Sequence, residues 1–340
     1  MHRFPAASLL TLGITACTMS PTPIAPSTPI ATSVPHEGSA PGEPLASQIP
    51  PAIEAALRRM GQVIDPMASA RLYAPLHPRE PYAGVKVQRA LAYGTDVRHR
   101  LDAFTPTATG GPARAVLVFV HGGGFVSGDR RMGDSPFYDN VMLWATEQGM
   151  VGVNITYRLA PQHPWPAAQE DLAAALRWVR QHIGEYGGDA SRIVLMGHSA
   201  GATHVAQYLG HAQFHVAPNG GALGAVLVSP LPLFDMAMAD PSVLQLIQNY
   251  FGRDASRYPE QSPMPGLRNT SVPLLLAYAE LDPGDFRRQV LKAHDALCQA
   301  GRCPGLLELR GHGHISEIQA VHTSDRALGD AVARFIATLH

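Results

Sequence analysis

The sequence contains few charged residues and has no strong net charge. Only 16% of its 340 residues are Asp, Glu, Lys or Arg, well below the roughly 25% of an average soluble domain. The formal net charge of -1 creates no field that would attract DNA, RNA or an anionic lipid surface. The composition therefore excludes a charged tail, a long coiled coil and a basic nucleic-acid-binding protein.

The apolar stretch at the start of the chain is too short to cross a membrane. Residues 4–16 carry almost no charge, but a transmembrane helix needs about 20 apolar residues. A basic residue before this stretch and small residues after it are typical of a secretory signal peptide. The end of the stretch, Ile-Thr-Ala-Cys at residues 14–17, resembles the bacterial lipobox, in which the signal is cut before a cysteine that receives lipid.

We therefore expect a lipoprotein signal peptide over residues 1–16 and a lipid anchor on Cys17. Plain secretion and an uncleaved start are the alternatives. Thr18 follows the cysteine where an inner-membrane retention signal would have Asp. For a Gram-negative host the resemblance then implies the periplasmic side of the outer membrane.

Residues 17–52 contain little that could form a core. Nine prolines lie between residues 19 and 51, among Ser, Thr and Ala, and the charged residues there are Glu37 and Glu43. Such a composition favours extended, polyproline-like backbone. We expect a stiff tether that ends where the folded domain begins.

Cysteine is scarce as well, with three in the chain. Apart from Cys17 there remain Cys298 and Cys303, which are separated by four residues. In an oxidising compartment such a pair is expected to form a disulfide that closes a small loop. Two free buried thiols are the alternative.

From residue 53 onward, apolar runs alternate with helical stripes. Strands are expected at residues 85–93, 97–104, 115–120, 152–156, 193–196, 225–228, 274–278 and 306–309. Helices are expected at residues 53–64, 137–147, 172–183, 200–209, 243–250, 286–300 and 325–339. This alternation predicts one α/β domain over residues 53–340, with a mostly parallel eight-stranded sheet and helices on both faces. Segments 53–80 and 230–271 are expected to form a small cap.

Residues 197–201, Gly-His-Ser-Ala-Gly, match the G-x-S-x-G pattern of a nucleophile elbow. The pattern lies between a predicted strand and a predicted helix, and this context distinguishes an elbow from a chance match. A tight turn there would expose Ser199, and the start of the helix would offer free N–H groups to a developing oxyanion. We predict Ser199 as nucleophile and the N–H of Ala200 as an oxyanion donor.

Residues 121–125, His-Gly-Gly-Gly-Phe, follow directly after a predicted strand. Consecutive glycines let backbone N–H groups approach a substrate, and this pattern forms the second half of an oxyanion hole. We predict Gly123 and Gly124 as its donors and expect His121 to brace the loop. A phosphate-binding loop is the alternative, but no lysine or G-x-G-x-x-G pattern accompanies the glycines.

A serine nucleophile needs a general base that a carboxylate orients, in the chain order Ser, acid, His. Asp282 follows a late predicted strand and is the expected acid, with Glu280 as the alternative. His314 follows the last predicted strand and is the expected base, with His312 as the alternative. A His-x-His metal pair is a rival interpretation, but no cluster of carboxylates or cysteines completes it.

Residues 157–168, Tyr-Arg-Leu-Ala-Pro-Gln-His-Pro-Trp-Pro-Ala-Ala, closely resemble the YRLAPEHPFPA signature of the hormone-sensitive-lipase-like esterases. These esterases are part of the α/β-hydrolase superfamily, and the HGGGF and GHSAG motifs and residues 186–201 agree with it. His198 is a departure, because those lipases usually have Asp there. GHSAG with the late Gly-His-Gly-His-Ile-Ser is closer to the bacterial carboxylesterase and kynurenine-formamidase-like branch.

The resemblance implies a Ser-His-Asp hydrolase of small to medium carboxylic esters, acting through an acyl-enzyme without metal or cofactor. The alternatives are an aryl-formamide amidase and a non-catalytic binding lipoprotein. The expected partner is a small-molecule ester, with no nucleic acid, and with membrane contact only through the anchor. Substrate-pocket candidates are Phe125, Trp165 and Phe234, with Tyr250 and Phe251 as further aromatics, although residues of this kind more often belong to the core.

Overall fold

The computed structural model describes residues 48–108, 110–233 and 235–339 of the chain. The predicted signal peptide, Cys17, most of the predicted tether and Phe234 lie outside the described residues. Within the described part, no helix is both long and apolar enough to span a membrane. The folded unit that carries the predicted motifs lies within residues 43–340.

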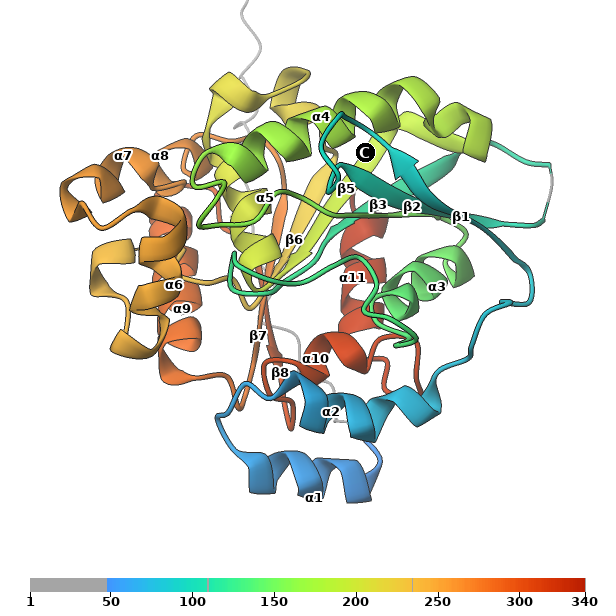
Figure 1. The fold of residues 1–340 in the computed structure, drawn as a ribbon, viewed down its shortest axis with the longest axis horizontal. Coiled ribbons are helices and arrows are strands. Elements are labelled where there is room, and N and C mark those ends of the chain that lie inside the picture. Colours follow the sequence, from blue (N-terminus) through green and yellow to red (C-terminus); the bar gives the residue numbers. More distant parts are fainter. Residues whose placement is uncertain (1–47, 109, 234, 340) are drawn as a thin grey trace, which may run out of the picture. The chain divides into compact units, whose positions relative to one another are not determined.

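The centre of this unit is one eight-stranded sheet in the order β1-β2-β4-β3-β5-β6-β7-β8 (Figure 1). The strands are β1 Val85–Ala92, β2 Arg100–Pro106, β3 Arg114–Val120, β4 Val151–Ile155, β5 Gly188–His198, β6 Gly224–Val228, β7 Leu274–Ala279 and β8 Gly305–Leu309. β2 pairs antiparallel with both of its neighbours, and the other neighbouring pairs are parallel. The predicted mostly parallel eight-stranded sheet is confirmed.

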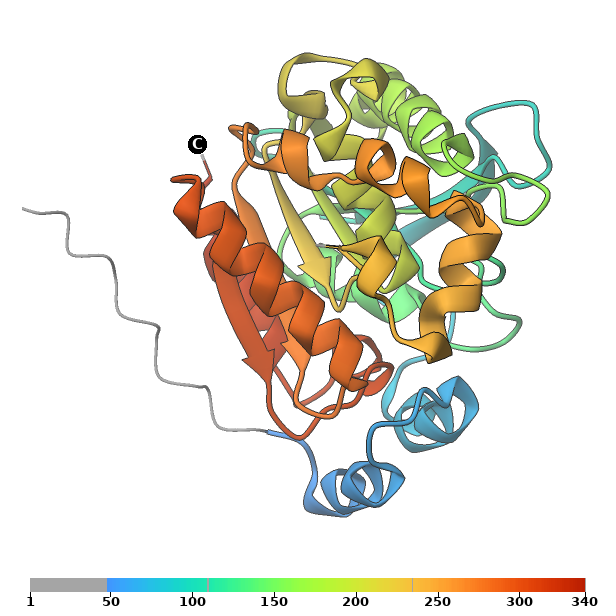
Figure 2. The same ribbon diagram turned by 90° about the vertical axis from the view of Figure 1, so that its left-hand side faces the viewer.

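Long helices cover both faces of the sheet (Figure 2). One face packs against α4 (Ala167–His182), α5 (Ala200–Gly210) and α9 (Gly284–Gln299). The opposite face packs against α3 (Asp139–Glu147) and α11 (Ala327–Ala337). The disulfide between Cys298 and Cys303 lies at the end of α9.

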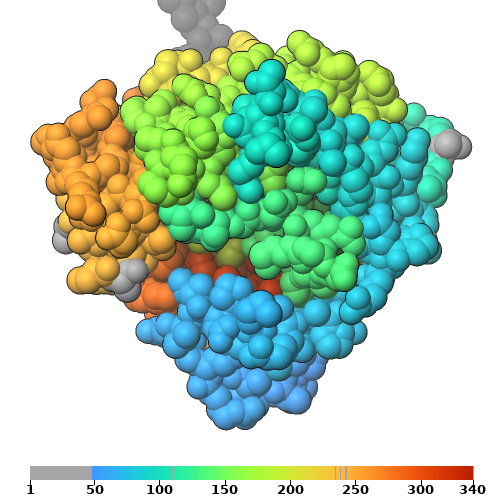
Figure 3. Space-filling view, viewed as in Figure 1, coloured from blue at the N-terminus to red at the C-terminus, as the bar shows by residue number. Residues whose placement is uncertain are grey.

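The described part contains six further α-helices. They are α1 (Pro51–Met60), α2 (Pro66–Tyr73), α6 (Pro241–Phe251), α7 (Tyr258–Gln261), α8 (Met264–Leu267) and α10 (Ser316–Gln319). Short 3-10 helices complete the described elements: η1 Ala74–Leu76, η2 Ile183–Tyr186, η3 Ala212–Phe214, η4 Pro218–Gly221, η5 Met236–Met238 and η6 Ala255–Arg257. In the space-filling view the surface is hollowed between the blue N-terminal residues and green mid-chain residues, with red residues at the floor (Figure 3).

The predicted helix over residues 53–64 is wrong at its end. α1 stops at Met60 because Gly61 takes a φ of 65°, a left-handed value that ends a helix. Asp65 then caps α2 by accepting a hydrogen bond from the N–H of Ala68 at 2.8 Å. Ile64 therefore lies in a connection between two helices.

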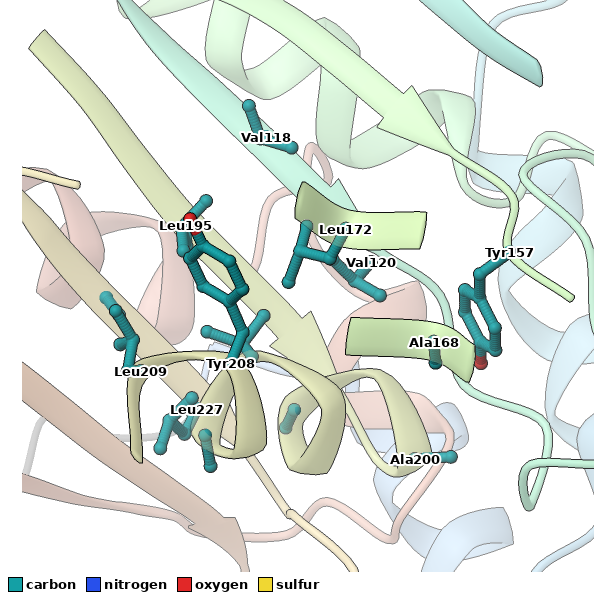
Figure 4. Packing of buried hydrophobic residues seen from close by; sticks show 14 of the residues in the cluster. Val118, Val120, Tyr157, Ala168, Leu172, Leu195, Ala200, Tyr208, Leu209 and Leu227 are labelled. Atoms are coloured by element: carbon teal, nitrogen blue, oxygen red, sulfur yellow. The ribbon is translucent and has the colours of Figure 1, made fainter. Parts of the chain in front are cut away.

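The apolar runs of the central strands bury alternate side chains on opposite faces. One cluster joins the strands to α4 and α5 and includes Val118, Val120, Leu195, Leu227, Leu172 and Tyr208 (Figure 4). Leu117 and Phe119, the intervening residues of β3, belong to the cluster on the opposite face. Complete burial of one such aliphatic or aromatic side chain is worth roughly 1.5–3 kcal/mol. The requirement for burial on both faces explains the unbroken apolar run over residues 115–120 of β3.

Candidate active site

Ser199 occupies a strained turn between β5 and α5. Its φ of 54° and ψ of -124° are unusual for a residue with a side chain. A hydrogen bond to β6 fixes the turn: the N–H of Ser199 donates to the carbonyl of Val228 at 2.9 Å. This backbone conformation is the nucleophile elbow that the sequence pattern predicts.

The two glycines of the pattern are required by close backbone contacts. A Cβ atom on Gly201 would lie 2.0 Å from the carbonyl oxygen of Val120, and one on Gly197 would lie 2.4 Å from that of Gly201. Both distances are far below van der Waals contact. A side chain at Gly201 would push α5 away from β3, and one at Gly197 would push α5 away from β5. Either change would open the turn that holds Ser199.

Three of the predicted site residues form a chain of hydrogen bonds. His314 Nε2 lies 2.9 Å from Ser199 Oγ, and His314 Nδ1 lies 2.8 Å from Asp282 Oδ1. The exposed fractions are 6% for Ser199, 2% for His314 and 1% for Asp282. Because β5, β7 and β8 are parallel, the residues that follow them meet at one edge of the sheet.

The second oxygen of Asp282 is also occupied. Asp282 Oδ2 accepts hydrogen bonds from Ser229 Oγ at 2.6 Å and from the N–H of Ala279 at 2.9 Å. These donors stabilise the carboxylate and fix its rotation, so that Oδ1 faces His314. Ser229 was missed in the sequence analysis, although its place directly after a buried parallel strand is a signal that could have found it.

The two alternatives for acid and base have other partners. Glu280 accepts from the N–H of Gly311 at 2.7 Å and pairs with Arg58 of α1 at 3.1 Å. The bond from Gly311, followed by Arg58, lowers the pKa of Glu280. His312 Nε2 lies 2.7 Å from Asp325 Oδ2 and away from Ser199. The structure thus joins Asp282 and His314, not these alternatives, to the serine.

The glycine loop after β3 lies against Ser199. A Cβ on Gly122 would come 3.1 Å from the Ser199 Cβ, and φ is 131° at Gly123 and 59° at Gly124. Within the described ranges, no backbone acceptor is found for the N–H groups of Gly123 and Gly124. Ala200 is the first residue of α5, where an N–H has no partner inside the helix. These three N–H groups are free to bind an anion.

Buried side chains brace this loop. His121 Nδ1 lies 2.7 Å from the carbonyl oxygen of Gly122, and burial lowers the His121 pKa to about 4. The neutral ring therefore acts as an N–H donor at Nδ1. Tyr157, the first residue of the YRLAP segment, donates its hydroxyl to the carbonyl of His121 at 2.8 Å. The loop conformation thus depends on a signature residue 36 positions away.

A cavity of about 720 Å³ opens beside Ser199. Its walls are mainly aliphatic and come from the connection between α1 and α2, from α6 and from the start of α9. The lining includes Val63, Ile64, Val243, Leu246, Phe286, Met132, Tyr138 and Gln319, together with Gly122, Gly123, Gly124, His198, Ser199 and His314. Parts of both segments predicted to form a cap therefore face the reacting atoms.

Four of the aromatic pocket candidates, Phe125, Trp165, Tyr250 and Phe251, do not line this cavity and pack in or against the core cluster. Phe125 takes a φ of 70°, is 1% exposed and stacks on Tyr250 with ring centroids 4.9 Å apart. Phe251 meets the Phe125 ring edge-on in the same core cluster. Trp165 packs against His211 and Phe214. Phe234, the remaining candidate, lies outside the described residues.

The strand order, the serine elbow and the glycine loop together define an α/β-hydrolase. Comparison with known proteins agrees: residues 117–316 match the model of the Abhydrolase_3 family, described as alpha/beta hydrolase fold. The match covers more than half of the chain, and the chain belongs to this family. The resemblance to the hormone-sensitive-lipase-like group within the α/β-hydrolases is confirmed.

Several relatives carry names of esterases. The chain is 30% identical over 248 residues to the carboxylesterase NlhH of Mycobacterium tuberculosis, covering 66% of this chain and 74% of that protein. It is 42% identical over 98 residues to the esterase LipI of the same organism, an alignment that spans 29% of each chain. The chain thus matches less than a third of the length of LipI.

Solved structures show the same fold at low sequence identity. An inhibited esterase B from Lactobacillus rhamnosis has a TM-score of 0.67 at 17% identity, with 84% of this chain and 94% of that chain covered. A hyperthermophilic esterase from the archaeon Pyrobaculum calidifontis has a TM-score of 0.63 at 21% identity, with 86% and 98% covered. At these identities the likeness concerns the fold.

Proposed function

We propose that this chain is a serine carboxylesterase that hydrolyses small to medium esters through an acyl-enzyme. The observation that carries the proposal is the hydrogen-bonded series from Ser199 through His314 to Asp282 beside an apolar cavity. Family membership and the esterase names of the relatives support it further.

In the proposed reaction Ser199 Oγ attacks the ester carbonyl carbon while His314 Nε2 takes the serine proton. Asp282 stabilises the imidazolium that forms. The N–H groups of Gly123, Gly124 and Ala200 would bind the negatively charged oxygen of the tetrahedral intermediate. His314 then returns the proton to the departing alcohol, and the acyl group stays on Ser199.

The second half of the reaction repeats these steps with water. His314 takes a proton from water, whose oxygen attacks the acyl carbon, and the carboxylic acid leaves as Ser199 regains its proton. Side chains and backbone N–H groups of this chain perform each proton transfer and charge stabilisation. The aliphatic wall of the cavity favours an uncharged acyl or alcohol group.

A series of p-nitrophenyl esters with acyl chains of increasing length tests this proposal. We expect the highest kcat/KM with short and medium chains, because a cavity of about 720 Å³ holds such groups and excludes the longest ones from full burial. Product release would be followed as p-nitrophenolate absorbance against a buffer blank. Failure to hydrolyse any member of the series would contradict the proposal.

Aryl-formamide hydrolysis is the second candidate, and His198 in the GHSAG motif favours it. N-formylkynurenine would be assayed beside p-nitrophenyl butyrate. A kcat/KM at least tenfold higher for the formamide would replace the esterase proposal with an amidase. A protein that hydrolyses neither compound and does not react with a fluorophosphonate would instead be a non-catalytic binding lipoprotein.

We also propose that the enzyme is anchored in the bacterial cell envelope by lipid on Cys17. The apolar stretch before Cys17 and the proline-rich segment after it support this cellular location. Growth with radiolabelled palmitate should label the wild-type protein but not Cys17→Ala. Equal labelling of the two proteins would refute the anchor.

A further inference from the structure

A second histidine and carboxyl pair lies directly behind the proposed triad. His198 Nε2 is 2.7 Å from the backbone carbonyl oxygen of His314 and 3.4 Å from Glu317 Oε1. The side chains of His198 and Glu317 are 1% and 0% exposed. The esterase mechanism above makes no use of either residue.

The hydrogen-bond roles in this pair follow from the carbonyl group. A carbonyl oxygen can only accept, so His198 Nε2 carries a hydrogen and donates it to His314. The opposite ring nitrogen of His198 has no hydrogen-bond partner within the described part of the chain. Burial, and next the proximity of His314, lower the pKa of His198 to about 3, so the ring is neutral.

Burial disfavours the charged form of Glu317 as well. Burial raises its pKa well above the usual range, the Asp282 carboxylate raises it further, and the Ser229 hydroxyl offsets this in part. A Glu317 oxygen, a ring nitrogen of His198 and one of His314 all lie within 4.8 Å of one another. An ionised Glu317 would therefore place a second negative charge close to the ring that Asp282 orients.

His198 and Glu317 belong to two segments of the site that are far apart in the sequence. His198 directly precedes Ser199 at the end of β5, whereas His314 and Glu317 follow β8. Two other strands, β6 and β7, separate β5 from β8 in the sheet. The bond from His198 to the His314 carbonyl thus ties the elbow directly to the loop that carries the base.

We propose that His198, beside an uncharged Glu317, is a positioning residue that holds Ser199 and His314 at the distance required for proton transfer. This inference rests on the proposed esterase function. An aspartate at position 198 is an acceptor when ionised and could not donate to the His314 carbonyl. The hydrogen bond from His198 to the His314 carbonyl, which we call the brace, therefore requires the histidine of this motif.

Substitution of His198 tests the brace, with kcat counted per site that a fluorophosphonate titrates. His198→Ala should lower this kcat for p-nitrophenyl butyrate by about tenfold or more, since a displacement of about 1 Å can cost as much as 100-fold. KM should stay within about twofold. His198→Gln, whose amide N–H can replace the Nε2 donor, should recover at least a third of the wild-type kcat.

His77 provides a matched control. Its Nε2 lies 2.8 Å from the carbonyl oxygen of Gln319, so it is another buried histidine bonded to the same C-terminal segment, but away from the serine. His77→Ala should lower the melting temperature and leave kcat per titrated site within about twofold of wild type. An equal loss of kcat in His77→Ala and His198→Ala would overturn the proposal, because the effect would then be general destabilisation.

Substitution of Glu317 tests its neutral state. Glu317→Gln should keep the acid limb of the kcat/KM profile within about 0.3 pH units of wild type. If Glu317 were anionic, its replacement by Gln would remove a negative charge beside the reacting groups and shift the limb to lower pH. Such a shift would contradict the neutral pair.

His198→Gln keeps the test decisive even where His198→Ala does not fold, since loss of most of its kcat per titrated site would contradict the proposal. The measurements distinguish failure of this inference from failure of the proposed esterase function. A wild-type protein with Ser199-dependent ester hydrolysis, whose His198→Ala variant keeps wild-type kcat, overturns the brace alone. A wild-type protein that hydrolyses no ester overturns the function on which the brace rests.

Discussion

Ser199→Ala is expected to lower kcat for p-nitrophenyl butyrate by at least about 10⁴-fold. The variant keeps the cavity and the oxyanion donors but has no oxygen that could form the acyl-enzyme. The His314 ring, 2.9 Å from the serine oxygen in the wild type, is left without the proton that it would accept. Steady-state kinetics on the purified variant gives the ratio.

The same strand offers a control for this substitution. Ser191 lies on β5, is exposed and hydrogen bonds to Asp189 at 2.6 Å. Ser191→Ala removes a hydroxyl at the far end of the strand and should leave kcat within about twofold. Comparable hydrolysis by Ser199→Ala and the wild type would show that another group performs the chemistry.

Asp282→Asn is expected to lower kcat by about 10⁴-fold, because the amide would impose the wrong tautomer on His314. The N–H of Ala279 can only donate, so it would retain the amide oxygen at the place of Oδ2. The amide NH₂ would then face His314 Nδ1 and force this nitrogen to accept. Nε2 would carry the hydrogen and could not take the proton of Ser199.

Asp325→Asn is the matched control for this tautomer effect. Asp325 also bonds a buried histidine, His312, at 2.7 Å, but that ring does not contact Ser199. Its loss of kcat should stay below about tenfold. Steady-state kinetics at a pH where the wild type is fully active measures both variants, and equal losses would mean that Asp282 acts only through stability.

The sheet and the main site residues could be predicted because their signals are local. A strand segment buried on both faces is apolar at every position, as over residues 115–120 of β3, and the turn around Ser199 requires glycine at fixed places. Asp282 and His314 were predicted from chain order and from their positions after strands. Parallel strands bring such residues together wherever they occur in the sequence.

The walls of the cavity could not be predicted in this way. Val63, Ile64 and Leu246 come from distant segments whose place near Ser199 depends on packing of the whole unit. Phe125 and Trp165 lie beside recognisable motifs, but adjacency in sequence does not decide whether an aromatic ring faces the core or the cavity. Phe125 has a positive φ, and its ring stacks on Tyr250 within the core.

Ser229 could be suspected from its place directly after a buried strand, but its contact with Asp282, and that of Glu317 with His198, cannot be read from the sequence. Glu317 meets His198 across 119 positions of the chain, and Ser229 meets Asp282 across 53. Neither residue belongs to a pattern with a known spacing. His198 was noticed as a departure within its motif, but its donor role depends on the carbonyl that the structure places opposite it.

The most direct test of the central claim is to identify the residue that becomes covalently modified. The wild-type protein would be treated with a fluorophosphonate, digested and analysed by mass spectrometry. The account predicts one adduct per chain, on Ser199 within the Gly-His-Ser-Ala-Gly peptide, formed in parallel with the loss of esterase activity. Loss of activity with the adduct on another residue, or esterase activity that persists after Ser199 is fully modified, would contradict it.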